Sequence, residues 1–266
     1  MNDVAFHADN ATFYSASADK SVKAWRFASD APVRNIAGHA GNVDGVAFSP
    51  NGQELASCSH DGTIRIWTVA TGAAVRTINA FTQPAATAVY TVSWSPDGKQ
   101  LLGGSLNQML RLFDAASGNL VREFKAYNEK DFPKGHKGKV YTAAFSKDGQ
   151  FLLSGGDDMQ IKVWSVADGQ VVRQLIDPSI PPTPGAASER AHADWIEHIR
   201  FSPDGARVAS VGYAGWLKVW NFADGKLIYQ QKLLPKAIYA VSFSSDGKSL
   251  ATGNDNGTAF VLKAPN

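Results

Sequence analysis

The stretch NGQELASCSHDGTIRIWT, from Asn51 to Thr68, decides the fold of this chain. Its two turn signals, Asn51-Gly52 and His60-Asp61-Gly62, border short segments in which apolar and polar residues alternate. Such segments between Gly, Asn and Asp turns are typical of β-strands. With its flanks, the stretch predicts four antiparallel strands of one small sheet: Val43 to Pro50, Glu54 to Ser57, Thr63 to Thr68, and Ala73 to Ile78.

The same sheet recurs along the whole chain. An aromatic residue ends the first strand of each copy, and a large apolar residue follows 19 residues later. The six pairs are Phe6 and Trp25, Phe48 and Trp67, Trp94 and Phe113, Phe145 and Trp164, Phe201 and Trp220, and Phe243 and Leu262. The distance between successive copies varies from 42 to 56 residues, whereas the interval within a copy is constant. A rigid module with linkers of variable length indicates a repeat array.

Composition restricts the functional classes. The 266 residues contain 26 Lys plus Arg and 24 Asp plus Glu, a balance that disfavours a dedicated nucleic-acid binder with a basic face. No apolar run is long enough for a transmembrane helix, and the N-terminus shows no signal peptide. The single cysteine, Cys58, excludes an internal disulfide and reads as a small buried residue. These features favour a reducing compartment, and we expect a cytoplasmic protein.

Four features of the second copy, Gly38-His39, Phe48-Ser49-Pro50, Asp61 and Trp67, resemble the WD-repeat family of β-propellers. The fourth copy repeats them as Gly135-His136, Phe145, Asp158 and Trp164. The resemblance covers nearly the whole chain. The Trp-Asp pair that names the family is altered, because the residues after the tryptophans are Arg26, Thr68, Ser165 and Asn221. Phe113-Asp114 keeps the aspartate.

The resemblance implies an all-β fold, a six-bladed β-propeller of four-stranded antiparallel sheets whose neighbouring blades cover each other's faces. We expect a single propeller domain over residues 1–266, with blades at about 1–38, 39–84, 85–135, 136–191, 192–233 and 234–266. The last copy ends after a third strand, Thr258 to Leu262, so the last blade lacks its outer strand. We therefore expect a segment of a longer protein, or a blade completed by a strand from elsewhere, which includes self-association.

In the family, a hydrogen-bonded chain links a His of the incoming loop, a strand Ser or Thr, an Asp of the tight turn and the Trp. By matching positions, the chain is His39, Ser57, Asp61 and Trp67 in the second copy, and His136, Ser154, Asp158 and Trp164 in the fourth. The third copy has Gly103 and Phe113 at these positions and should lack the chain. The fifth keeps Ser210 and Trp220 but has Ala214 in place of the Asp.

The loops that lead into a new blade carry all the variation in length. Three of them are long: Ala80 to Ala88, Tyr127 to Lys139, and Asp177 to Trp195. In a propeller these loops emerge on the face opposite the short turns, and loops carry function more often than the scaffold does. We expect the binding surface on this loop-rich face. The alternative is that these loops are tolerated surface insertions.

A second signal indicates the same face. Four residues before each strand-ending aromatic, near the mouth of the central channel in the family, the chain has polar or tyrosine residues. With the neighbouring aromatics, the candidate partner-binding residues are Asp44, Tyr90, Tyr141, Trp195, Glu197, Tyr213, Trp216 and Tyr239. Tyrosine is typical of protein interfaces because its ring is rigid and its hydroxyl forms hydrogen bonds. The alternative is that these tyrosines pack between blades.

Catalytic and cofactor motifs are missing from the sequence. It contains no G-x-S-x-G, no glycine-rich phosphate loop and no CxxC, and the spacing of His192, Glu197 and His198 matches no metal site. We therefore expect no enzyme activity, no cofactor and no metal. The favoured function is a non-catalytic scaffold that binds a protein or peptide partner through the loop-rich face and channel mouth.

Two alternative functions remain open. One is a propeller enzyme or small-ligand binder at the channel mouth. The other is a nucleic-acid-associated subunit that uses Lys134, His136, Lys137 and Lys139, although a short run of lysines is more often a solvated loop.

Overall fold

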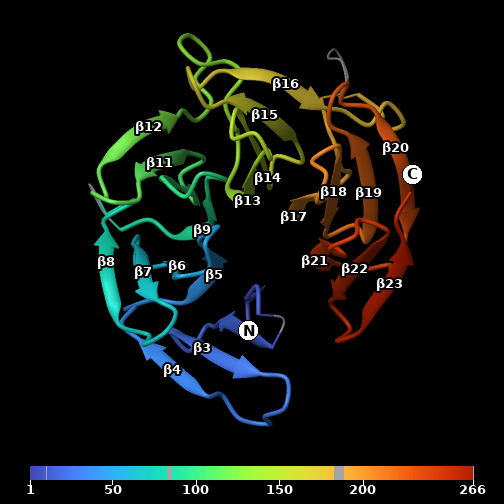
Figure 1. The fold of residues 1–266 in the computed structure, drawn as a ribbon. Helices are drawn as coiled ribbons and strands as arrows, with labels where there is room; N and C mark the ends of the chain where they lie inside the picture. Colours follow the sequence, from blue (N-terminus) through green and yellow to red (C-terminus); the bar gives the residue numbers. More distant parts are fainter. Residues whose placement is uncertain (10, 83–85, 183–188, 266) are drawn as a thin grey trace. The chain divides into compact units, whose positions relative to one another are not determined.

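The structure is a computed structural model that describes residues 1–9, 11–82, 86–182 and 189–265. Within these ranges 23 β-strands form six antiparallel sheets, five of four strands and a last one of three (Figure 1). Each sheet is a propeller blade, and the six are called blades 1 to 6 in chain order. The predicted fold class, an all-β propeller of six blades whose last blade lacks its outer strand, is confirmed. No described helix is long and apolar enough to cross a membrane.

Blades 1 to 3 contain the first twelve strands. They are β1 Asp3–Phe6, β2 Thr12–Ala16, β3 Ser21–Arg26, β4 Arg34–Ala37, β5 Val43–Phe48, β6 Glu54–Ser59, β7 Ile64–Thr68, β8 Ala74–Ile78, β9 Val89–Trp94, β10 Gln100–Ser105, β11 Leu110–Asp114 and β12 Leu120–Phe124.

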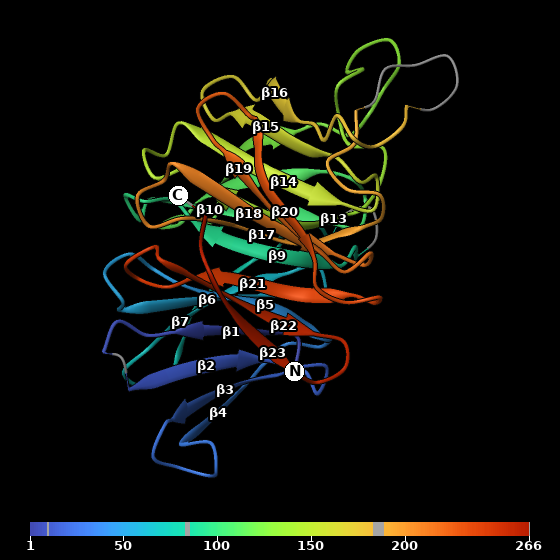
Figure 2. The ribbon, with the colours of Figure 1, turned by 90° about the vertical axis from the view of Figure 1, so that its right-hand side faces the viewer.

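Blades 4 to 6 contain the remaining eleven described strands. They are β13 Val140–Phe145, β14 Phe151–Gly156, β15 Ile161–Ser165, β16 Val171–Leu175, β17 Ile196–Phe201, β18 Arg207–Gly212, β19 Trp216–Asn221, β20 Leu227–Lys232, β21 Ile238–Phe243, β22 Ser249–Asn254 and β23 Ala259–Lys263. Figure 2 shows the last three strands side by side in blade 6.

The chain divides into two compact units, Met1–Glu123 and Phe124–Asn266. Within each unit the first strands of successive blades contact one another: β1 with β5 and β5 with β9 in the first, β13 with β17 and β17 with β21 in the second. The first strands therefore form one side of each unit, and the fourth strands lie at the other edge of each sheet.

The turns between first and second strands explain the recurring Ser-x-Asp-Gly pattern. In blade 4, Ser146 Oγ donates to Asp148 Oδ1 at 2.5 Å and accepts the Phe151 N–H at 3.0 Å. Gly149 follows with a left-handed φ of 71°, which is favourable for glycine and strained for other residues. The side chains thus satisfy the backbone at a position where the chain must reverse.

In blades 2 and 5, the large residue 19 positions after the strand-ending aromatic packs against the preceding blade. Trp67 is 3% exposed and belongs to a core cluster with Tyr14, Val22 and Ile36 of blade 1. Trp220 of blade 5 is fully buried in a cluster that includes Ile161 of blade 4. Neighbouring sheets therefore bury each other's apolar faces, which a single four-stranded sheet could not do.

Arginines on the fourth strands join successive blades. Arg34, Arg76 and Arg173 each follow the tryptophan of their blade by nine residues. Each guanidinium donates to backbone carbonyls of the next blade just after its third strand: Arg34 to Val69 O at 2.8 Å and Ala70 O at 2.9 Å, Arg76 to Ala115 O at 2.6 Å, and Arg173 to Ala223 O at 2.6 Å. These charge-assisted bonds fix the spacing between adjacent sheets.

We expect Arg173→Ala to lower the free energy of unfolding by about 1–2 kcal/mol, because hydrogen bonds from a charged donor are lost. Urea unfolding followed by tryptophan fluorescence measures the change. Lys226→Ala is the matched control. The Lys226 side chain is 79% exposed, and its only ion pair within the described chain is with the neighbouring Asp224. Equal losses in the two variants would contradict the role assigned to Arg173.

Candidate interaction site

A buried hydrogen-bonded chain stiffens blade 2. The Trp67 indole N–H donates to Ser57 Oγ at 2.8 Å, and Ser57 Oγ lies 2.8 Å from His39 Nε2. His39 Nδ1 lies 3.0 Å from Asp61 Oδ2. Burial acts to raise the pKa of Asp61, but hydrogen bonds from His39 and Thr63 hold it below its ordinary value. The structure thus brings together the four residues predicted for this blade.

Blade 4 repeats the arrangement. Trp164 donates to Ser154 Oγ at 2.7 Å, Ser154 Oγ lies 2.6 Å from His136 Nε2, and His136 Nδ1 lies 2.7 Å from Asp158 Oδ2. The Asp158 carboxylate accepts a hydrogen bond from His136 Nδ1–H. In a neutral imidazole, His136 Nε2 then accepts a hydrogen bond from the Ser154 hydroxyl. Every polar group of the chain is then paired, which a buried network requires.

Blade 5 contains a histidine that sequence reasoning missed. His192 Nε2 lies 2.7 Å from Ser210 Oγ, which also accepts the Trp220 indole N–H at 2.9 Å. Burial, with the charge of Lys218 nearby, lowers the pKa of His192 to about 3. The available signal was spacing, because His192 precedes its serine by 18 residues, as His39 and His136 precede theirs.

Blade 5 also replaces the missing turn aspartate with a different ion pair. Ala214 occupies the aspartate position. The buried Lys218 ammonium pairs with Asp177 of the incoming loop and donates to Ala191 O at 2.8 Å. A buried charge needs such pairing, so this contact fixes both ends of the described part of the loop.

Blades 1 and 3 depart from the network. In blade 1, Trp25 donates to Ser15 Oγ at 2.9 Å. In blade 3, a Cβ added at Gly103 would lie 2.9 Å from the Ile64 side chain, so a serine does not fit without displacement. Phe113, at the tryptophan position, has no N–H to donate.

The first strands of blades 2 to 6 each contain a β-bulge at the same position. In blade 5, Ile196 pairs with Gly212 and His198 pairs with Val211, so Glu197 is the extra residue. The corresponding residues are Asp44, Tyr90, Tyr141 and Tyr239. A bulge redirects the extra side chain away from the regular pleat. The positions singled out four residues before each strand-ending aromatic are therefore structurally equivalent.

Four rings of the second unit form a continuous series, here called the aromatic row: Tyr141, Trp195, Tyr213 and Tyr239. The ring centroids lie 6.2 Å apart for Tyr141 and Trp195, 5.1 Å for Trp195 and Tyr213, and 5.9 Å for Tyr213 and Tyr239. Trp195 and Tyr213 are each 39% exposed, and Tyr239 is 45% exposed. The row therefore spans blades 4, 5 and 6 and presents apolar ring surface to solvent.

The turn that carries Tyr213 is held by its backbone. The Tyr213 N–H donates to Trp195 O at 3.0 Å, and Gly215 O accepts the Leu233 N–H at 2.9 Å. A Cβ added at Gly212 would lie 1.9 Å from Trp195 O, and one added at Gly215 would lie 2.0 Å from Leu234 O. Only glycine permits these close approaches, so the two glycines fix the position of the Tyr213 ring.

Glu197 is the bulge residue of β17, the first strand that lies between the first strands of Tyr141 and Tyr239. The Ile199 N–H donates to Thr142 Oγ1 at 3.1 Å and the Val241 N–H donates to His198 Nδ1 at 3.0 Å, so three adjacent first strands are held in register around Glu197. Within the described chain, no hydrogen-bond donor and no cation contacts this carboxylate. Burial raises the pKa of Glu197 to about 7.

The first unit has a different cluster at the corresponding positions. Asp44 Oδ2 lies 2.6 Å from His60 Nε2, and Asn2 Nδ2 donates to Asp44 Oδ1 at 3.0 Å. The His60 ring meets the Tyr90 ring edge-on, with centroids 5.5 Å apart. Burial raises the pKa of Asp44 to about 6, and the neighbouring His60 and Asn2 limit the rise.

The remaining candidates are less informative. Trp216, the first residue of β19, is half-buried. Asp157, at the blade 4 position that corresponds to His60, has a raised pKa because it is buried, and its Oδ1 atom has no hydrogen-bond partner in the described structure. Of the long loops, residues 83–85 and 183–188 lie outside the described residues. Within the described ranges, no three His, Cys, Asp or Glu side chains are grouped to hold a metal ion.

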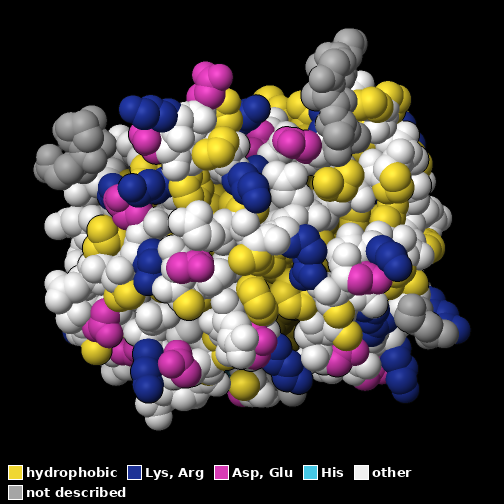
Figure 3. Space-filling model, turned by 90° about the horizontal axis from the view of Figure 1, so that it is seen from above, with side chains coloured by type: hydrophobic (Ala, Val, Ile, Leu, Met, Phe, Trp, Pro, Cys, Tyr) yellow, Lys and Arg dark blue, Asp and Glu magenta, His cyan; other side chains and the backbone are white. Residues whose placement is uncertain are grey.

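Three observations on the described residues bear on the nucleic-acid alternative. On the face drawn in Figure 3, basic and acidic side chains are interspersed among the described residues. His136 is fully buried in the blade 4 network and is not available to an outside ligand, contrary to its assignment in that alternative. Lys137 lies over the Tyr127 ring, 4.4 Å from its centroid.

We expect Ser154→Ala to lower the free energy of unfolding by about 2–4 kcal/mol, because Trp164 and His136 both lose their buried partner. Ser15→Ala is the matched control, since only the half-buried Trp25 loses a partner there. Urea unfolding of both variants measures the difference. A loss in Ser15→Ala as large as in Ser154→Ala would show that the histidine link adds nothing.

The raised pKa of Glu197 predicts a pH-dependent difference in stability. The folded-state pKa, about 7, lies above the ordinary value of 4.5, so the contribution of this group is fully present below pH 4.5 and is lost as the pH rises through 7. Glu197→Gln should therefore match the wild type near pH 4.5 and exceed its stability at pH 8, by at most about 3 kcal/mol. Thermal unfolding at both pH values checks this, and an unchanged difference would contradict it.

Comparison with known proteins agrees with this architecture. The family described as "WD domain, G-beta repeat" matches residues 1–26, 30–68, 75–114, 128–165, 187–221 and 229–261, which is most of the chain. Apoptotic protease-activating factor 1 of Rattus norvegicus is 32% identical over 130 residues, 49% of this chain and 10% of that protein. Small ribosomal subunit protein RACK1 of Caenorhabditis elegans is 28% identical over 159 residues, 48% of this chain and 49% of that protein.

Transducin beta-like protein 2 of Homo sapiens is 27% identical over 137 residues, 48% of this chain and 27% of that protein. The chain thus spans between a tenth and a half of the length of these relatives. Each matched segment contains the first two strands and all or most of the third strand of one blade, and the segments 30–68, 75–114 and 229–261 also contain all or most of the fourth strand of the preceding blade. On the matched repeats and the fold together, the chain belongs to the WD-repeat family.

Proposed function

We propose that this protein is a non-catalytic scaffold that binds a protein partner through the aromatic row of blades 4 to 6. WD-repeat propellers generally mediate protein–protein interactions, which gives the general class. The observation that carries the specific proposal is the unbroken series of ring contacts in which Trp195, Tyr213 and Tyr239 stay 39–45% exposed.

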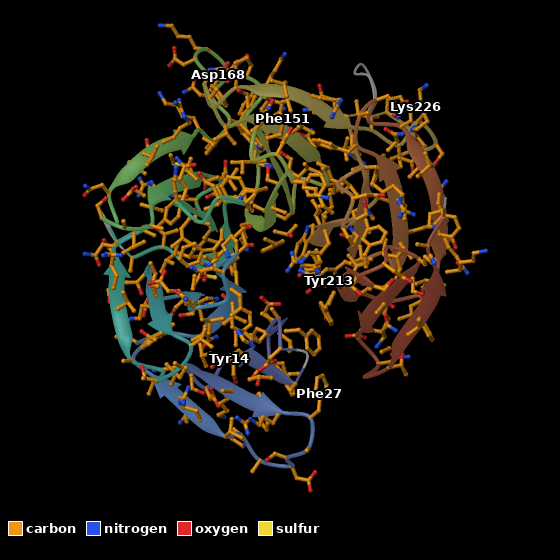
Figure 4. The ribbon with its side chains drawn as sticks, viewed as in Figure 1. Tyr14, Phe27, Phe151, Asp168, Tyr213 and Lys226 are labelled. Carbon is orange, nitrogen blue, oxygen red and sulfur yellow. The ribbon has the colours of Figure 1, made fainter. Side chains whose placement is uncertain are left out.

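The aromatic row has the properties of an interface centre. Tyr and Trp bring large contact area with few rotatable bonds, and such residues dominate measured binding energies. Mutual ring contacts and the two close-packed turn glycines hold the row in place before binding, which reduces the entropy lost on association. Figure 4 shows Tyr213 on the side of the first strands and Lys226 on the side of the outer strands.

The position of the row also favours a polypeptide ligand. Its members come from three successive blades and from both a loop and the inner strands. A surface of this kind extends along several blades, and an extended segment of a partner could contact all four rings. A small molecule would need an enclosing cavity with converging polar groups instead.

The proposal predicts that Tyr213→Ala combined with Tyr239→Ala reduces partner binding at least about tenfold, because hot-spot aromatics cost 2 kcal/mol or more on truncation. Affinity capture with the purified chain, followed by quantitative mass spectrometry, identifies the bound proteins and measures their loss. The interaction with each identified protein is then measured with purified components.

The control is Val172→Ala combined with Ile228→Ala. These side chains are 53% and 41% exposed on the outer strands β16 and β20. This pair should bind as the wild type does, and both double variants should melt near the wild-type temperature. Undiminished binding by the Tyr213 and Tyr239 pair would remove the aromatic row as the interaction surface.

A further inference from the structure

Blades 2 and 5 carry an acidic residue at the same bulge position of the first strand, and their surroundings differ in one respect. Asp44 of blade 2 is paired with His60, whose Nε2 atom lies 2.6 Å from Asp44 Oδ2. His60 belongs to the tight turn between the second and third strands. In blade 2, a side chain of the same blade therefore serves as the partner of the carboxylate at the bulge position.

Blade 5 lacks that internal partner. Tyr213 occupies the turn position that corresponds to His60, because each precedes the tryptophan of its blade, Trp220 or Trp67, by seven residues. A tyrosine side chain carries no positive charge at neutral pH. Within the described chain, no other cation or donor reaches the Glu197 carboxylate, although the side chain is half-buried. Burying a carboxylate away from water without a hydrogen-bond or ion-pair partner costs free energy.

The rings beside Glu197 are also suited to a cation. Tyr213 keeps the edge-to-face contact with the next bulge residue that His60 makes in blade 2: the Tyr213 and Tyr239 rings meet at 86°, as the His60 and Tyr90 rings meet at 89°. The aromatic geometry is thus retained, while the imidazole nitrogen that contacts the carboxylate in blade 2 is lost. Aromatic faces attract ammonium and guanidinium groups, most strongly where water is excluded.

Lys236, a basic side chain near the Tyr239 end of the row, pairs with a different carboxylate. Lys236 Nζ lies 3.5 Å from Asp255 Oδ2, and Asp255 also accepts the Tyr239 hydroxyl at 3.2 Å. Lys236 therefore neutralises a different carboxylate at the far end of the row. Glu197 is left as the acidic group of the row that a ligand would have to satisfy.

We propose that the partner segment inserts a lysine or arginine side chain beside Glu197, where it occupies the place that His60 takes in blade 2. The inference rests on the proposed function, because it specifies the chemistry of the ligand at the same aromatic row. The carboxylate accepts hydrogen bonds from the cation, and the rings of Trp195 and Tyr213 contact its aliphatic stem and charged head.

The direct test uses three capped pentapeptides with Lys, Arg or Gln between flanking glycines, Ac-GGXGG-NH2. Titration is followed by the NMR signal of the Trp195 indole N–H, assigned with Trp195→Phe. The Lys and Arg peptides should shift this signal in a saturable manner, and the Gln peptide should not. Glu197→Gln should weaken the Lys and Arg peptides at least about tenfold, because a charge-assisted contact is lost.

A second pair of variants separates charge from ring shape. Tyr213→His, compared with the wild type at pH 8, where Glu197 is ionised, installs at blade 5 the imidazole partner that His60 provides at blade 2, and it should block the cationic peptides. Tyr213→Phe keeps an uncharged ring there and should retain them. Equal binding of Lys and Gln peptides, or full binding to Glu197→Gln or Tyr213→His, would overturn the proposal.

The outcomes also separate this inference from the proposed function. In one outcome, the double variant Tyr213→Ala with Tyr239→Ala loses its protein partners, while Glu197→Gln keeps full affinity for those partners and for the peptides. That outcome refutes the cation site and leaves the proposed binding surface in place. If the Lys and Arg peptides require Glu197 but the same double variant keeps its protein partners, the cation site stands and the proposed surface is refuted.

Discussion

A sheet of four short strands has two apolar faces and can bury them only against neighbouring sheets. The rest of this structure follows from that constraint. In blades 2 and 5, the residue 19 positions after the strand-ending aromatic fills the space against the preceding blade, as Trp67 and Trp220 show. Arginines of the fourth strands then donate to backbone carbonyls just after the third strand of the next blade, so that polar contacts also join adjacent sheets.

Repetition also makes the exceptions informative. Where a repeat position is used for stability, the chain keeps a paired polar network, as in Ser57 and Ser154 with their histidines. Where blade 5 departs from the pattern, the departures gather at one side: Tyr213 stands where blade 2 has His60, Trp195 remains exposed, and Glu197 is left without a partner within the described chain. Residues that are neither buried in the core nor paired within the described chain are available to a ligand. The proposed interaction site consists of such residues.

Much of this architecture could be predicted from the sequence, because turn residues and the constant interval fix each sheet locally. The strands of blade 2 were placed within about two residues, with Ser49 and Pro50 excluded from β5 because they belong to the turn. The contacts of the aromatic row could not be predicted, because they join a loop, a tight turn and two first strands that lie far apart in sequence. His192 was missed because its blade lacks the turn aspartate, and the buried Lys218 with Asp177 has no counterpart in the other copies to reveal it.

The central claim is that the aromatic row is the surface that a partner covers. Hydroxyl-radical footprinting of the chain alone and with a captured, purified partner measures this at each ring. The account predicts strong protection of Trp195, Tyr213 and Tyr239 in the complex and unchanged oxidation of Phe27, which is 66% exposed in blade 1. Protection of Phe27 with undiminished oxidation of the row would contradict the account.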